Sequence, residues 1–200
     1  MRHDAGKLLV VSGPSGAGKS TVIHKMMAGR EDLRFSVSAT TRAPREGEVD
    51  GKDYYFLDRE RFERMIQENA FLEHAEYVGN YYGTPAAPVL ESLEKGISVI
   101  LDIEVQGASN VRKAMPDAVT VFLAPPSFEA LEARLRGRGQ DSDEKIRQRL
   151  ARAREEYREI PKYDYIVIND DADEAAQELA AILLSSQCRT ADRLSLLQED

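Results

Sequence analysis

Four short and almost uninterrupted apolar runs divide the chain into alternating strands and helices. The runs cover residues 7–12, 97–101, 119–123 and 165–168. Strands carry such runs when helices cover both faces of a parallel sheet. Apolar residues at helical spacing fill segments 19–28, 88–94, 108–115, 128–136, 144–159 and 174–184. This order predicts an α/β fold with three α/β/α layers around a parallel core sheet.

Residues 35–84 depart from that order. Short alternating runs at 35–38 and 54–57 lie on either side of several turn signals, and a polar helix is expected near 59–69. Short strands at hairpin spacing predict a small mixed or antiparallel lobe inserted into the parallel sheet. We therefore expect one compact unit, with residues 1–34 and 85–200 as the core and 35–84 as the inserted lobe.

A glycine-rich loop follows the first predicted strand and opens the first predicted helix. Its sequence is Gly13-Pro14-Ser15-Gly16-Ala17-Gly18-Lys19-Ser20, followed by Thr21. Glycines allow successive N–H groups to point at one anion at the positive end of the helix. Lys19 is expected to reach the β- and γ-phosphates, and the Ser20 hydroxyl to ligate Mg²⁺. The loop predicts a nucleoside triphosphate site.

Composition places this site in an ordinary globular enzyme. The 200 residues are 42% hydrophobic and 31% charged, with a net charge of −8. An acidic surface disfavours nucleic acid and anionic membranes as partners. No apolar run reaches membrane-spanning length, and the N-terminus lacks the apolar core of a signal peptide. The single cysteine, Cys188, excludes an intrachain disulfide and indicates a reducing cytoplasm.

Six motifs in a fixed order give the chain a resemblance to a known family. They are the loop at 13–20, Ser-Val-Ser-Ala-Thr-Thr-Arg-Ala-Pro-Arg at 36–45, Gly-Glu-Val-Asp-Gly-Lys-Asp-Tyr-Tyr-Phe at 47–56, Gly-Asn-Tyr-Tyr-Gly-Thr at 79–84, Leu-Asp-Ile-Glu-Val-Gln-Gly at 101–107 and Arg-Gly-Arg-Gly at 136–139. Together they resemble guanylate kinases, which phosphorylate GMP with ATP. The match runs from the first strand to about Asp171.

The resemblance implies a guanine site made of Ser38, Glu73, Thr84 and Asp102. Guanine presents two adjacent donors, N1–H and the 2-amino group, which one carboxylate can accept together. Glu73 takes that place in the family pattern. Adenine lacks both donors and would leave the carboxylate unpaired, so selection against adenine is expected.

For the phosphate of GMP, the resemblance implies two arginines and two tyrosines, supported by one glutamate. Arg42 and Arg45 can present two guanidinium groups to one phosphate. Tyr54 and Tyr82 match the family's hydroxyl positions, and Glu48 is expected to orient an arginine.

A glycine-interrupted stretch with several arginines, at about 134–150, resembles the lid of nucleoside monophosphate kinases. Its closure is expected to bring Arg138 and Arg149 onto the transferring phosphoryl group. Arg134 and Asn169 are implied to contact the ATP adenine. Arg152, Arg154 and Arg158, interleaved with glutamates, are interpreted as a salt-bridged helix face.

The expected reaction transfers the γ-phosphoryl group of ATP to GMP or dGMP, which yields ADP and a guanosine diphosphate for purine metabolism. Lys19, Arg42, Arg138 and Arg149 are the expected catalytic residues. No general base is needed, because the attacking oxygen already belongs to an anionic phosphate.

Three other functions are weighed against this reading. A ribose bisphosphate kinase would not need Ser38, Glu73 and Thr84. A binding module of guanylate-kinase type is expected to lose loop residues such as Lys19, and a GTPase would need an Asn-Lys-x-Asp element, which is absent. Glu104 stands where the family pattern often has Asp, so its role stays open. The tail at 185–200 and the choice between monomer and homo-oligomer stay open too.

Overall fold

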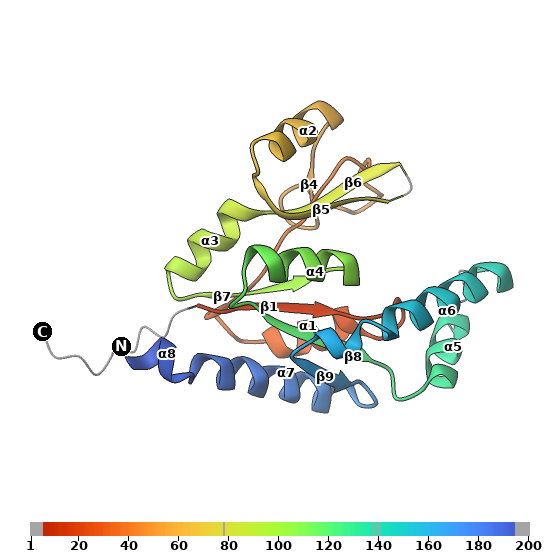
Figure 1. Ribbon diagram of the computed structural model, residues 1–200. Helices are drawn as coiled ribbons and strands as arrows, with labels where there is room; N and C mark the ends of the chain where they lie inside the picture. The colour runs from red at the N-terminus through yellow and green to blue at the C-terminus, as the bar shows by residue number, and fades with distance from the viewer. Residues whose placement is uncertain (1–5, 78, 138, 140, 195–200) are drawn as a thin grey trace, which may run out of the picture.

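A sheet of five parallel strands forms the centre of the protein, which is described here from a computed structural model for residues 6–77, 79–137, 139 and 141–194 (Figure 1). The strand order is β2-β7-β1-β8-β9. Their bounds are β1 Leu8–Ser12, β2 Leu33–Phe35, β7 Ser98–Asp102, β8 Val119–Ala124 and β9 Tyr165–Ile168. The parallel core sheet predicted from the apolar runs is confirmed.

Side chains of the central strand alternate between two cores, because successive residues of a strand point to opposite faces. Leu9 and Val11 pack with α1 (Lys19–Met27) and α7 (Ala172–Gln187). Leu8 and Val10 pack with α3 (Ala86–Glu94) and α4 (Val105–Ala114). Figure 1 shows these two helical layers below and above the sheet. The α/β/α arrangement therefore leaves the carboxyl ends of the strands as the open edge where loops can carry a site.

A second, smaller sheet lies beyond α4, at the top of Figure 1. Its order is β4-β3-β6-β5, formed by β3 Ala39–Thr40, β4 Tyr55–Phe56, β5 Phe71–Tyr77 and β6 Asn80–Pro85. The β3–β4 pair is parallel, while β3–β6 and β5–β6 are antiparallel. The helix α2 (Arg59–Gln67) covers this sheet by placing Phe62 against the rings of Phe71 and Tyr81, with centroid distances of 4.4 and 5.3 Å.

The strand expected at 35–38 is wrong in its position. Phe35 ends β2, whose backbone pairs with β7 in the large sheet, and the first strand of the small sheet begins only at Ala39. A run of alternating residues cannot indicate which of two sheets will provide its partner strand. Pairing partners are decided by the tertiary arrangement.

Two antiparallel helices, α5 (Phe128–Gly137) and α6 (Asp143–Tyr157), project from one end of the large sheet, on the right of Figure 1. They enclose a core of their own, with Leu131 and Leu135 packed against Ile146 and Leu150. Ser142 caps α6 by accepting a hydrogen bond from the Lys145 N–H at 3.3 Å. A 3₁₀ turn (Ile160–Lys162) leads on to β9, and α8 (Thr190–Arg193) follows α7.

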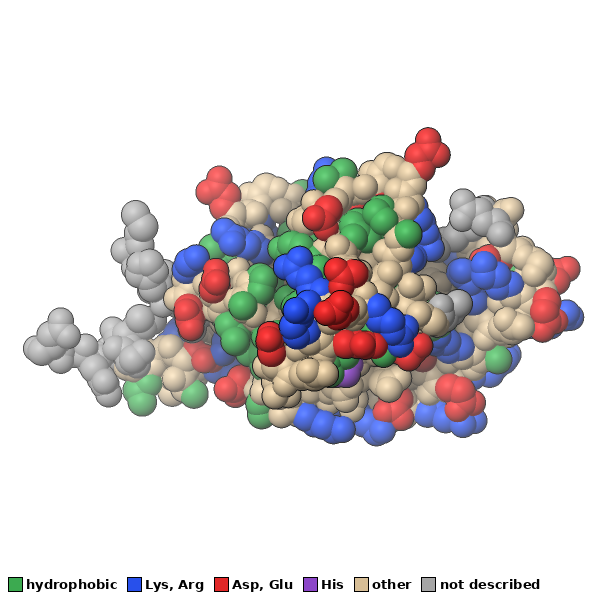
Figure 2. All heavy atoms as spheres, turned by 90° about the horizontal axis from the view of Figure 1, so that it is seen from above, with side chains coloured by type: hydrophobic (Ala, Val, Ile, Leu, Met, Phe, Trp, Pro, Cys, Tyr) green, Lys and Arg blue, Asp and Glu red, His purple; other side chains and the backbone are tan. Residues whose placement is uncertain are grey.

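Two further features concern the molecule's surface. Within the described ranges, no helix combines the length and apolar character needed to cross a bilayer. Seen from above the small sheet, basic and acidic side chains are interleaved over the molecule (Figure 2). On this face the net negative charge is thus not gathered into one patch.

Candidate functional site

The glycine-rich loop joins β1 to α1 in a backbone conformation that only glycine adopts easily. Gly13, Gly16 and Gly18 have φ values of 145°, 97° and 94°. A Cβ at Gly13 would lie 2.0 Å from the Leu123 carbonyl oxygen, and one at Gly18 would lie 2.3 Å from Asn169 Nδ2. These close approaches explain why the sequence needs glycine at both positions.

Three side chains from distant parts of the chain contact this loop. Asn169 Nδ2 donates to the Ala17 carbonyl at 2.7 Å. Arg134 donates to the same carbonyl at 3.3 Å and to the Asn169 carbonyl at 2.8 Å. Arg149 donates to Ser15 Oγ at 3.2 Å and lies 3.2 Å from Asp141. Helices α5 and α6 and Asn169, the residue after β9, thus hold the loop in place.

Lys19 opens α1 and turns back over the loop. Its Nζ donates to the Gly13 carbonyl at 2.7 Å and lies 3.8 Å from Asp102 Oδ1, at the carboxyl end of β7. Burial raises the pKa of Asp102, while the ammonium of Lys19 opposes that rise. An anion placed in the loop would meet Lys19 and the backbone N–H groups of the first turn of α1.

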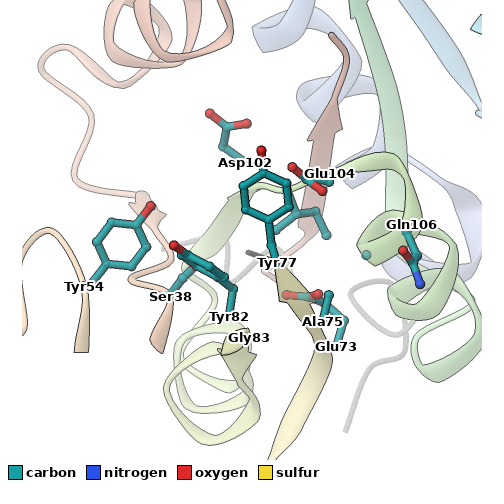
Figure 3. Close-up of a pocket in the computed structure, with 12 residues that line it drawn as sticks. Ser38, Tyr54, Glu73, Ala75, Tyr77, Tyr82, Gly83, Asp102, Glu104 and Gln106 are labelled. Carbon is teal, nitrogen blue, oxygen red and sulfur yellow. The ribbon is translucent and has the colours of Figure 1, made fainter. Parts of the chain in front are cut away.

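A cavity of about 270 Å³ lies between the small sheet and the start of α4 (Figure 3). We call it the Glu73 cavity. The Tyr54 and Tyr82 rings lie on one side of it, and Glu104 and Gln106 lie on the other. The complete lining is Ser38, Tyr54, Glu73, Ala75, Tyr77, Tyr82, Gly83, Asp102, Ile103, Glu104, Gln106 and Gly107.

Glu73 is the most buried carboxylate of this cavity, with 9% of its surface exposed. Its Oε1 accepts a hydrogen bond of 2.7 Å from Thr84 Oγ1. Burial raises the pKa of Glu73, the Thr84 hydrogen bond opposes that rise, and the negative charge of Glu104 adds to it. On the other side, a Cβ at Gly107 would lie 2.8 Å from Glu73 Oε2. The carboxylate is held between Thr84 and Gly107 and lines the cavity.

Arg42 is paired with Glu48 beside this cavity. Its two terminal nitrogens donate to the two carboxylate oxygens at 2.9 and 2.8 Å, and the Arg45 N–H also donates to Glu48 at 2.7 Å. This pairing lowers the pKa of Glu48. The guanidinium carbon of Arg42 lies 5.4 Å from the Tyr54 ring centroid, and the Tyr54 and Tyr82 rings meet edge to face at 6.3 Å. Arg42 is therefore held next to two tyrosines.

A second cavity of about 250 Å³ opens at the glycine-rich loop, and we call it the loop cavity. Lys19 and Ser15 line it from the loop, and Arg149, Arg152 and Glu156 line it from α6. Tyr77 and Glu104 line both this cavity and the Glu73 cavity. The two cavities therefore adjoin at these two side chains.

The structure brings most of the predicted site residues together around these two cavities. Thr84 lies directly behind Glu73, whereas Arg42, Arg45 and Glu48 lie beside the cavity rather than in its lining. Asn169, which is expected to contact the adenine, donates its amide Nδ2–H to the Ala17 carbonyl of the loop. The prediction for Arg138 concerns a position outside the described residues.

Sequence reasoning missed several residues of the site. Gly107 gave a usable signal, because a glycine inside a helix usually marks a close approach. Tyr77 and Gln106 gave none. Arg152 does pair along α6 with Glu156, as expected of a salt-bridged helix face, but it also reaches Glu104, the residue before α4, at 2.6 Å.

Comparison with known proteins gives one consistent result. The family model described as guanylate kinase matches residues 5–186. The guanylate kinase of Rubrobacter xylanophilus is 54% identical over 89% of this chain and 93% of its own length, and that of Caldanaerobacter subterraneus is 49% identical over 92% and 89%. A crystal structure of guanylate kinase from Anaplasma phagocytophilum is 38% identical, covers 94% of this chain and 90% of its own, and superposes with a TM-score of 0.76. With its glycine-rich loop and Glu73 cavity on one edge of the same fold, this chain belongs to the guanylate kinase family.

Proposed function

We propose that this protein transfers the γ-phosphoryl group of ATP to GMP, and also to dGMP, with the donor in the loop cavity and the acceptor in the Glu73 cavity. The observation that carries the proposal is that the two cavities adjoin at Tyr77 and Glu104. Phosphoryl transfer needs the two phosphates in line and close together, and adjoining cavities on one sheet edge provide that placement.

Guanine is the base that suits the Glu73 cavity. Glu73 is held between Thr84 and Gly107 and lines the cavity. A carboxylate held this way can accept both donors of the guanine Watson–Crick edge. Ser38 and Asp102 complete the polar lining. No ribose 2′-hydroxyl contact is needed for this recognition, so dGMP is expected as a second acceptor.

The phosphate of GMP is assigned to Arg42, Arg45, Tyr54 and Tyr82, with Glu48 as the residue that orients Arg42. The two hydrogen bonds from Arg42 to Glu48 support that orienting role. On the donor side, Gly13 to Thr21 hold the phosphates of ATP, and Arg134 and Asn169 contact its adenine. Lys19, Arg42, Arg138 and Arg149 neutralise the charge of the moving phosphoryl group.

Magnesium is the metal that the residues fit. Mg²⁺ keeps most of its water and is held by substrate phosphates with one or two protein ligands. Ser20 in the first turn of α1 offers one hydroxyl, and in the described part of the chain no group of three or more acidic, histidine or cysteine side chains forms a metal cage. Bound with ATP, the ion supplies positive charge to the β- and γ-phosphates.

We further propose the domain division of the sequence analysis, with the core at 1–34 and 85–200, the GMP-binding lobe at 35–84, and the lid at about 134–150. The exposed, unpaired thiol of Cys188 supports a reducing compartment, and we infer a cytoplasmic location.

The direct test is a coupled assay of ADP release with ATP and Mg²⁺. GMP, dGMP, AMP, CMP, UMP and ribose 1,5-bisphosphate are supplied in separate reactions. Turnover with GMP and dGMP alone is the expected result. Turnover with the sugar phosphate alone would reject the guanine assignment, and no turnover from folded protein that still binds GMP would indicate a binding module.

A further inference from the structure

Arg152 joins three parts of the molecule at the point where the two cavities adjoin. It lies on α6, and its NH2 group donates to Glu104 Oε2 at the start of α4, at 2.6 Å. Its Nε donates to Glu156 Oε1 on the same helix at 3.2 Å. Its guanidinium carbon lies 5.6 Å from the ring centroid of Tyr77, on β5 of the small sheet.

Two arginines near the ends of α6 make simpler contacts. Arg147 pairs with Glu144 and Arg158 pairs with Glu155, each three residues away along the chain and each at 2.8 or 2.6 Å. Those ion pairs stay on the surface of one helix. The Glu104–Arg152 pair instead spans 48 positions of the sequence and connects two helices.

The acceptor of Arg152 belongs to the wall of the Glu73 cavity. Glu104 precedes the first residue of α4, and its side chain makes no capping hydrogen bond to that helix. Gly107, one turn further on, packs directly against the Glu73 carboxylate. Because Glu104 and Gly107 lie within one helical turn of each other, a shift of Glu104 would also change the distance between α4 and the Glu73 carboxylate.

We propose that Arg152 is a positioning residue for the acceptor nucleotide: by holding Glu104 and Tyr77, it keeps the first turn of α4 against the Glu73 cavity. The inference deepens the proposed function, because it takes the Glu73 cavity as the GMP site. Arg152 is assigned no contact with the transferring phosphoryl group. Because Arg152 also lines the loop cavity, its loss is expected to weaken GMP binding and, to a smaller degree, ATP binding.

The expected effect is modest, because the side chains of Arg152 and Glu104 are 47% and 59% exposed. Ion pairs this exposed contribute little individually, although a fork shared by two carboxylates and a ring is more ordered than a single pair. We expect the Kd for GMP to rise about fivefold in R152A. The change should shrink toward none in about 1 M salt, where the Debye length falls to about 3 Å.

The experiment measures GMP binding calorimetrically in the absence of ATP, and the KM for each nucleotide in the coupled assay. The variants are R152A, R152K, E104Q and the double variant R152A/E104Q. Arg158→Ala is the matched control, since it removes an ion pair of 2.6 Å from the same helix without reaching another element. Thermal unfolding of each variant checks that it is folded.

The proposal expects R152A and E104Q to raise the Kd and KM for GMP about equally, the double variant to add no more, and R152K to fall between wild type and R152A. It is overturned by an unchanged GMP affinity, by equal losses for ATP and GMP, by additive effects in the double variant, or by a loss that high salt does not reduce. If R152A does not fold, E104Q carries the test. Wild-type protein that neither binds nor phosphorylates GMP would reject the proposed function itself, which separates the two failures.

Discussion

Only 9% of Glu73 is exposed. This burial of a carboxylate is unfavourable for the stability of the free protein and favourable for binding a ligand that donates hydrogen bonds. An ionised carboxylate loses hydration there, and hydrogen bonding to Thr84 replaces part of it. Guanine would supply the two missing donors. The free protein therefore carries an unfavourable charge that its proposed ligand relieves.

The substitution Glu73→Gln should weaken GMP binding and selection. A glutamine offers one acceptor and one amide donor, so the donor would face a guanine N–H group. We expect the KM for GMP to rise about 10- to 100-fold, which corresponds to about 1.5–3 kcal/mol for a charged hydrogen-bonding group. Steady-state kinetics with GMP and AMP would measure this. Unchanged KM and selectivity would show that Glu73 does not read the base.

The same variant should be more stable than wild type without ligand at pH 7. Because the pKa of Glu73 is raised in the folded state, the folded protein binds this proton more tightly than the unfolded chain does. The stabilisation is present below pH 4.5, the ordinary value of the unfolded group, and is lost as the pH rises through the folded pKa. Glu73→Gln should therefore raise Tm at pH 7 by roughly 2–4 °C. The gain should vanish near pH 4, and a constant gain across this pH range would contradict the argument.

Substitution of Lys19 should lower turnover without lowering the affinity for GMP. The Lys19 side chain reaches over the loop to the Gly13 carbonyl and lies near Asp102. Lys19 itself is not part of the lining of the Glu73 cavity. Lys19→Ala should lower kcat by about 10²–10³, since one preorganised charge is removed from the transition state. Calorimetry should find GMP binding retained. Lys25→Ala, which removes an exposed pair with Asp173 from the same helix, is the control, and normal turnover in Lys19→Ala would refute the assignment.

At the scale of elements, the start of α4 is built for contact rather than for helix stability. Alanine inside a helix is more favourable than glycine by about 1 kcal/mol. At position 107, however, a Cβ would lie 2.8 Å from Glu73 Oε2. Either the carboxylate or the helix would have to move.

Gly107→Ala should consequently reduce GMP affinity by about tenfold and leave ATP binding at the loop unchanged, because the Glu73 carboxylate is displaced from its place beside Thr84. Ser109→Ala on the same helix is the control. The Kd for each nucleotide, measured separately, checks the expectation. Equal loss of ATP and GMP binding would indicate that the helix as a whole had shifted, which would contradict a local effect.

At the scale of the whole molecule, three parts of the structure line the Glu73 cavity and the loop cavity. The large sheet supplies the loop and Asp102, the small sheet supplies Glu73 and the tyrosines, and the α5–α6 pair supplies Arg149 and Arg152. The α5–α6 pair has a hydrophobic core of its own, which allows it to move as a unit.

We expect the protein to become more compact when both nucleotides are bound, because anionic phosphates would draw the arginines of the α5–α6 pair and of the small lobe together. Small-angle scattering of the free protein, and of the protein with GMP and a non-hydrolysable ATP analogue, should give a smaller radius of gyration for the second sample. Identical profiles would count against lid closure.

Features that depend only on neighbouring residues follow from the amino-acid sequence. Apolar runs, glycine positions and helix ends are local, so the parallel sheet and the glycine-rich loop at Gly13–Ser20 could be predicted from it. The six motifs in their fixed order also predicted the family of the chain.

Which distant side chains meet depends on how the helices and strands pack. Nothing near Leu33 in the sequence shows that β2 pairs with β7 in the large sheet, and nothing near Asn169 shows that its amide binds the Ala17 carbonyl, 152 positions away. Arg152 has a glutamate four residues along its own helix, and only the approach of α6 to α4 adds Glu104 as a second partner. Such contacts depend on how the packed elements are placed in three dimensions, and local propensity carries no record of that placement.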